Sequence, residues 1–208
     1  MLITNDFVFI HLQKCAGTFV RKFLKKTNLI TVNTTVKHDS VRQIPEKHKG
    51  KKIIGVIRNP WDWYVSWYSF RHKEGHSPQF GDLFEGSFES FLQKIFFDRH
   101  GIRNDINLDE LRSFGIGPYT GRYKNSYCCE DGNFANVSMI KMEDLYAGMI
   151  SEMKLTVEQI KILNSMNKVN TSSHPHYSTL YTDKTCKWIT DREQFIIHKY
   201  GYSFETSK

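Results

Sequence analysis

Apolar runs followed by amphipathic segments dominate the first third of the chain. The run at residues 7–10, FVFI, is wholly apolar, as in a strand buried on both faces of a parallel sheet. The small residues Cys15-Ala16-Gly17 follow it. Between residues 19 and 24 apolar side chains then recur on one helical face, while Arg and Lys occupy the other. Residues 7–26 are therefore predicted to form a strand, a tight turn and a helix.

A second unit of the same kind follows at residues 52–70. Residues 52–58, KIIGVIR, form an apolar strand that ends in Arg58. Asn59-Pro60 then supplies a cap and a first-turn proline for an aromatic-rich helix over residues 61–70. Two such units predict an α/β fold with a central, mostly parallel sheet flanked by helices. In such a sheet, ligands bind at the carboxyl ends of the strands.

Weaker patterns extend the prediction over residues 1–208, which we expect to form a single domain. Residues 115–122, GIGPYTGR, are rich in turn formers and are predicted to form a loop. The other predicted elements are strands at 29–32 and 136–141 and helices at 87–99, from Asn107, from Thr156 and at 183–200.

Composition narrows the range of partners and locations. The net charge of +7 favours an anionic partner, such as a nucleotide, a nucleic acid, an acidic glycan or a membrane surface. The four cysteines, Cys15, Cys128, Cys129 and Cys186, show no CxxC pairing and are predicted to be reduced. No apolar stretch reaches membrane-spanning length and no signal peptide precedes the first strand, so a cytoplasmic location is expected.

The turn after the first strand has the chemistry of an anion site. A helix that starts at such a turn directs its first backbone N–H groups at one point, and Lys14 and Thr18 add a cation and a hydroxyl. Phosphate or sulfate is the predicted occupant. The nucleoside-triphosphate pattern GxxxxGK[ST] is absent, and a strand-to-helix connection without a ligand remains the alternative.

The two units together resemble a known enzyme family. HLQKCAGTF, residues 11–19, resembles the 5′-phosphosulfate loop of sulfotransferases that use 3′-phosphoadenosine 5′-phosphosulfate (PAPS), particularly the carbohydrate type. IIGVIRNPWDWYVSWYSF, residues 53–70, resembles the family's 3′-phosphate motif, with Ser66 eight positions after Arg58. KMEDLY and the tail also resemble the family, so the similarity spans about residues 7–205. Gln13 and Phe19 depart from its usual Pro and Ser or Thr.

The resemblance implies a P-loop-like sulfotransferase fold with PAPS as co-substrate and no metal. The acceptor would be a hydroxyl of a carbohydrate, which would attack the sulfur in line while a histidine acts as base. Lys14 would stabilise charge on the departing 5′-phosphate, and His38, just after the second strand, would be the base. The implied PAPS contacts are Cys15, Ala16, Gly17, Thr18 and Phe19 at the phosphosulfate, Arg58 and Ser66 at the 3′-phosphate, and His174 and Tyr177 over the adenosine.

Simpler interpretations stay open for several of these residues. Arg58 could belong to a structural ion pair, and His38 to an ordinary solvated basic segment. His11 could line the site or cap the core, and residues 174–177 could form an ordinary surface loop. Acceptor specificity would lie in the loops at 72–86 and 101–122.

Two other function classes remain as alternatives. A nucleotide-dependent phosphotransferase would use the same sheet edge but lacks the triphosphate loop. A basic nucleic-acid-binding module would suit the charge and the aromatic content, yet no recognised motif appears and the diagnostic residues gather at strand ends. A nucleic-acid partner is therefore not expected. CxxC and HExxH metal motifs and the GxSxG nucleophile motif are also absent.

Overall fold

The computed structural model describes residues 1–34, 38–74, 83–98, 107–167 and 175–206, with the side chains of 71–74 excepted. The chain forms two compact units, Met1–Arg58 with Tyr123–Thr171 and Asn59–Arg122 with Ser172–Lys208. The first, here called the sheet unit, contains the five-stranded sheet. The second, the helical unit, consists of helices in its described residues. A single domain over residues 1–208 stays a prediction.

The sheet is mixed, with a parallel centre. Its order is β3-β1-β2-β4-β5, and β2, β4 and β5 run parallel. The predicted parallel core is therefore confirmed for these three strands, while β1 pairs antiparallel with both β2 and β3. The bounds are β1 Leu2–Ile3, β2 Phe7–Ile10, β3 Val32–Asn33, β4 Lys52–Ile57 and β5 Val137–Lys141.

The two antiparallel strands differ from the sequence prediction. A strand was expected at residues 29–32, but β3 begins only at Val32, because Leu29 still belongs to the turn that ends α1, where its N–H donates to the Leu24 carbonyl at 3.0 Å. Strand β1 was not predicted at all. Two residues are too few for an alternation pattern, and only pairing with β2 and β3 defines this strand.

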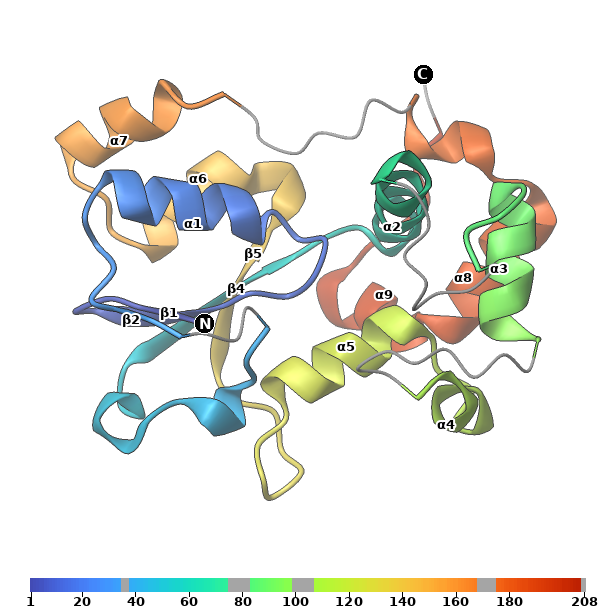
Figure 1. The fold of residues 1–208 in the computed structure, drawn as a ribbon, viewed down its shortest axis with the longest axis horizontal. Helices are drawn as coiled ribbons and strands as arrows, with labels where there is room; N and C mark the ends of the chain where they lie inside the picture. Colours follow the sequence, from blue (N-terminus) through green and yellow to red (C-terminus); the bar gives the residue numbers. More distant parts are fainter. Residues whose placement is uncertain (35–37, 75–82, 99–106, 168–174, 207–208) are drawn as a thin grey trace. The chain divides into compact units, whose positions relative to one another are not determined.

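Helices of the sheet unit cover the parallel strands. The predicted apolar face of α1 is confirmed, since Phe19, Val20, Phe23 and Leu24 are all buried. Figure 1 shows α1 and α6 over the same face of the sheet. The bounds are α1 Gly17–Lys26, α6 Leu145–Glu152 and α7 Val157–Asn164, with short 3-10 turns η1 Val41–Gln43, η2 Glu46–His48 and η4 Met142–Asp144.

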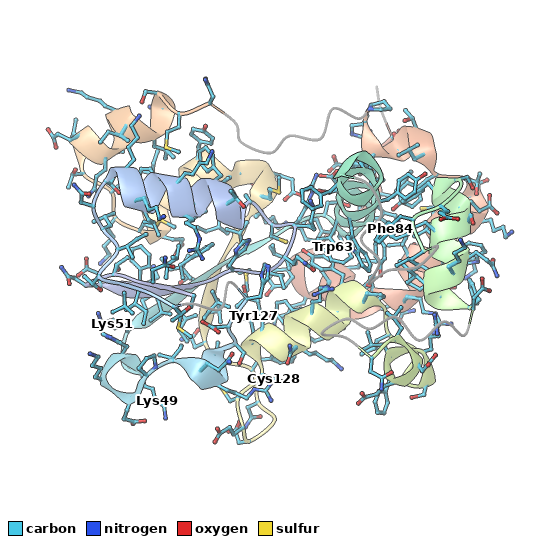
Figure 2. All side chains as sticks on the ribbon, in the orientation of Figure 1. Lys49, Lys51, Trp63, Phe84, Tyr127 and Cys128 are labelled. Carbon is cyan, nitrogen blue, oxygen red and sulfur yellow. The ribbon has the colours of Figure 1, made fainter. Side chains whose placement is uncertain are left out.

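The helical unit has an aromatic core. The rings of Trp63 and Tyr119 stack with centroids 4.6 Å apart, and Trp67 lies edge-on to Phe84 and Phe91. Figure 2 labels Trp63 and Phe84 in this core. The bounds are α2 Pro60–Glu74, α3 Phe88–Phe96, α4 Leu108–Ser113, η5 Tyr177–Leu180, α8 Asp183–Arg192 and α9 Gln194–Tyr200, and α5 Pro118–Tyr127 continues into the sheet unit.

The predicted loop at residues 115–122 is wrong in its second half, which is the start of α5. Pro118 is the first helical residue, where its missing N–H costs nothing. At Gly121 a Cβ would come within 2.7 Å of the Leu111 side chain, so close packing favours glycine at this helical position. Proline and glycine are typical of turns, which is why a loop was predicted. Here Pro118 starts the helix and Gly121 leaves room for Leu111.

The predicted helix at 183–200 is two helices, α8 and α9, separated at Glu193. The Glu193 carboxylate is fully buried and accepts hydrogen bonds from the Tyr119 N–H at 3.1 Å, the Thr120 N–H at 2.8 Å and the Tyr64 hydroxyl at 2.5 Å. It therefore caps the N-terminus of α5, where Gly117 offers no capping side chain.

Candidate active site

The turn between β2 and α1 has an unusual backbone. Lys14 and Ala16 have positive φ values of 62° and 51°, which few residues other than glycine adopt. Left-handed residues that alternate with right-handed ones direct successive N–H groups into a concave anion-binding nest. Such strained positions concentrate at functional sites. The geometry therefore agrees with the anion site that the sequence predicts for this turn.

Helix α1 begins without a side-chain cap. Ala16 is the N-cap residue, and the first intrahelical bond joins the Val20 N–H to the Ala16 carbonyl at 3.1 Å. The N–H groups of Gly17, Thr18 and Phe19 therefore belong to the first turn, where an α-helix has no internal acceptor for them. They and the helix dipole favour an anion at this end of α1.

Two residues of the predicted loop have structural roles as well. The Cys15 N–H donates to the Leu12 carbonyl at 3.3 Å, and the Cys15 side chain is buried. The Phe19 ring lies 5.5 Å from the Tyr146 ring of α6, so this side chain packs in the core. Only the backbone of Phe19 faces the start of the helix with the other amides of the first turn.

Arg58 lies against this loop. It follows β4, which pairs in parallel with β2, so both strands end at the same edge of the sheet. The Arg58 Nη1 donates to the Lys14 carbonyl oxygen at 3.3 Å, and Arg58 is buried with 8% of its surface exposed. The structure thus brings together the centres of the two sequence motifs.

His38 also joins the end of β2. Its Nδ1 lies 3.0 Å from the His11 carbonyl oxygen, and the two imidazole rings have centroids 4.7 Å apart. A carbonyl oxygen only accepts hydrogen bonds, so Nδ1 is the protonated nitrogen. In a neutral His38 the lone pair is then on Nε2, the arrangement that a general base needs.

Two other predicted site residues belong to the helical unit. Ser66 on α2 and Tyr177 on η5 are buried in the helical unit, and the Tyr177 hydroxyl accepts from the Glu205 N–H at 2.8 Å. The structure therefore gives Tyr177 a packing role, and its contact with adenosine stays a prediction. His174, as well as parts of the loops at 72–86 and 101–122, lies outside the described residues.

Sequence reasoning missed two interactions of this architecture. The contact from the His11 carbonyl to His38 involves backbone, so no side-chain pattern announces it. Glu193 looks like an ordinary position in a helical pattern. A signal for it did exist, because Gly117-Pro118 begins α5 with no Ser, Thr, Asp or Asn to cap it.

The described residues hold neither a three-residue metal cluster nor a membrane-spanning helix. No cluster of three or more His, Cys, Asp or Glu side chains suits a metal ion there. None of the described helices has the length and apolar character needed to cross a bilayer. All four cysteines are in the thiol form.

Comparison with known proteins identifies the family. The profile described as "Sulfotransferase domain" matches residues 13–154, which include Lys14, His38, Arg58 and Ser66. The chain belongs to the sulfotransferase family. Because the members of this family are enzymes, so is this chain. The match ends before Tyr177, whose predicted role is not covered by it.

A solved sulfotransferase has the same fold. The mouse sulfotransferase SULT7A1, solved in complex with PAP, superposes with a TM-score of 0.51 at 12% sequence identity. The alignment covers 94% of this chain and 84% of that one. A search of the curated proteins found no match. The α/β fold of this sulfotransferase, with its mixed sheet flanked by helices, is therefore that of the family.

Proposed function

We propose that this sulfotransferase moves the sulfuryl group of PAPS to a hydroxyl group of a carbohydrate. The observation that carries the proposal is the hydrogen bond from Arg58 to the Lys14 carbonyl. It joins the residues that would bind the two phosphate ends of one nucleotide, at the edge where parallel strands end. PAP, which is 3′,5′-adenosine bisphosphate, is what remains of PAPS when the sulfuryl group leaves, and it is bound in the structure of the mouse protein.

The turn before α1 would hold the 5′-phosphosulfate. Sulfuryl transfer resembles phosphoryl transfer, in which catalysis rests on positioning and on stabilising charge. The N–H groups of Gly17, Thr18 and Phe19 supply fixed dipoles toward that charge. Lys14 adds the cation that stabilises the oxygen from which the sulfuryl group departs.

Arg58 and Ser66 would hold the 3′-phosphate. A guanidinium forms charge-assisted hydrogen bonds with phosphate, frequently as a two-pronged fork. The Arg58 Nη1 donates to the loop carbonyl at 3.3 Å, which is long for such a bond. A phosphate oxygen would be the stronger acceptor for this group.

His38 would be the general base. Its Nε2 would take the proton of the acceptor hydroxyl as that oxygen bonds to sulfur. The bond between sulfur and the bridging oxygen breaks in the same displacement, and the electron pair leaves with PAP. The products are a sulfate ester, PAP and a protonated His38.

The carbohydrate acceptor is proposed from the loop sequence, HLQKCAGTF, and from its resemblance to the carbohydrate type. A net charge of +7 also suits an acceptor that carries uronate or sulfate groups. The cytoplasmic location also stays a prediction.

A transfer screen tests the proposal. The protein would be incubated with PAPS labelled in the sulfuryl group and with glycans, phenols or simple alcohols in parallel. We expect label in at least one glycan and none in the phenols. Label in phenols alone would overturn the carbohydrate acceptor. The proposed function itself would be overturned if no hydroxyl accepted label and the protein bound ATP with magnesium, or an oligonucleotide, instead of PAP.

A further inference from the structure

We infer that His11 is a positioning residue that fixes the tautomer and orientation of His38 while it holds the start of the phosphosulfate loop. The inference rests on the proposed function, in which His38 is the base. Its geometric part is independent of that role. His11 is the residue after β2, and only 5% of its surface is exposed.

The first contact of His11 is with His38. The His11 carbonyl accepts from Nδ1 at 3.0 Å, and the ring of His11 lies against the ring of His38, with centroids 4.7 Å apart and planes tilted by 49°. The carbonyl selects the tautomer and the ring limits the rotation of the His38 side chain. Two contacts from one residue define a side-chain position better than one hydrogen bond does.

The second contact of His11 is with the loop. A Cβ added to Gly17 would overlap the His11 ring at Cδ2 and Nε2, so this ring lies directly on the backbone of the first residue of α1. The ring also stacks on Phe9 of β2, at a centroid distance of 6.4 Å. His11 is thereby held from the strand side and from the helix side.

These contacts join the donor loop to the base. The His11 ring lies between Gly17, whose N–H belongs to the anion-binding turn, and His38. A single rigid residue therefore sets the spacing between the phosphosulfate site and the proton acceptor. In-line transfer needs such a spacing, since a displacement of about 1 Å can cost about 100-fold in rate.

The tautomer of His38 is the direct readout. Nitrogen NMR of histidine-labelled protein, at a pH where His38 is neutral and with its signals assigned through His38→Gln, reports which ring nitrogen is protonated. We expect Nδ1 to be protonated in the wild type. His11→Ala keeps the backbone carbonyl but loses the ring that limits rotation of His38. The His38 ring should then turn partly away from the carbonyl, and we expect a mixture in which the share of the Nε2–H tautomer is larger. An unchanged tautomer in His11→Ala would overturn the inference, whatever the activity.

Kinetics give the second readout. His11→Ala should lower kcat by about 100-fold and leave the Kd of PAP within about threefold, because the donor contacts remain. The matched control is Val20→Ala, which opens a cavity in buried α1 and should lower the melting temperature without changing tautomer or kcat. A changed tautomer with normal kcat would uphold the positioning by His11 and refute His38 as the base.

Gly17→Ala keeps the test decisive if His11→Ala folds poorly. The new methyl group should push the His11 ring aside and lower both the melting temperature and kcat. Removing that ring should relieve the overlap, so the double variant His11→Ala/Gly17→Ala should melt above Gly17→Ala and be no slower than His11→Ala. Fully additive losses in melting temperature and kcat would contradict the contact.

Discussion

The guanidinium Nη1 of Arg58 donates a hydrogen bond to the carbonyl oxygen of Lys14 at 3.3 Å. The two residues are 44 positions apart in the chain, and each follows one of two neighbouring parallel strands. This contact joins the proposed 5′ and 3′ ends of the nucleotide site. Substitution of Lys14 should therefore act at the 5′ end of the ligand, and substitution of Arg58 at its 3′-phosphate.

Lys14→Gly should separate stability from catalysis. Lys14 has a φ of 62°, which costs a residue with a side chain about 1–2 kcal/mol, and glycine relieves this at an entropic cost of about 0.5–1 kcal/mol. The free energy of unfolding should stay level or rise by up to about 1.5 kcal/mol. Transfer should fall by about 100- to 1,000-fold, since the cation at the leaving oxygen is lost. Denaturant melts and initial rates measure the two effects.

Lys22→Gly is the matched control for this change. Lys22 is exposed on α1, so the substitution should cost about 1 kcal/mol of stability and leave transfer unchanged. A Lys14→Gly variant that loses stability in the same way and keeps its transfer rate would show that Lys14 is an ordinary surface lysine.

His38→Ala should lower kcat by about 100- to 10,000-fold with PAP affinity nearly unchanged, because a base acts on the acceptor and not on the nucleotide. Single-turnover rates and calorimetry with PAP measure the two quantities. His176→Ala, in the helical unit, is the control and should behave as wild type. Near-normal turnover in His38→Ala would exclude His38 as the base.

Glu193 should make stability depend on pH near neutrality. Burial raises the pKa of this carboxyl from 4.5 to about 7, while hydrogen bonds from Thr120 and Tyr64 act to lower it. Because the pKa is raised on folding, the stabilising contribution is complete below pH 4.5 and is lost as the pH rises through about 7. Across this pH range the free energy of unfolding should fall by about 3 kcal/mol in total.

Glu193→Gln removes this titration. As the pH rises from 5 to 7.5, the wild type should lose unfolding free energy relative to Glu193→Gln. Denaturant melts at several pH values measure this difference. Thr120→Val, which keeps the carboxyl and removes one donor, should retain the pH dependence. A difference that stays constant across this range would contradict the raised pKa.

The strong sequence patterns predicted the parts of the fold that local physics decides. The apolar runs predicted at 7–10 and 52–58 correspond to β2 and β4, and the two-faced pattern after the first turn corresponds to α1. The meeting of Lys14 and Arg58 was predictable for the same reason, since neighbouring parallel strands end at one edge. These features depend on short stretches of chain and on one topological rule.

The missed features depend on contacts between distant residues. The start of α5 uses a carboxylate from Glu193, more than 70 positions away, and Gly121 is accepted only because Leu111 packs over it. Strand β1 exists through its pairing with β2 and β3. The role of His11 beside His38 rests on a backbone carbonyl. Such relationships have no periodicity, and the sequence alone left them open.

The nucleotide preference of Arg58→Ala tests the central claim most directly. Calorimetry would compare 3′,5′-adenosine bisphosphate with adenosine 5′-monophosphate, which lacks the 3′-phosphate, on wild type and on Arg58→Ala. The wild type should bind the bisphosphate at least about 100-fold more tightly, and Arg58→Ala should lose most of that preference while its affinity for the monophosphate changes little. A preference that survives intact in Arg58→Ala would contradict a nucleotide held between the Lys14 turn and Arg58.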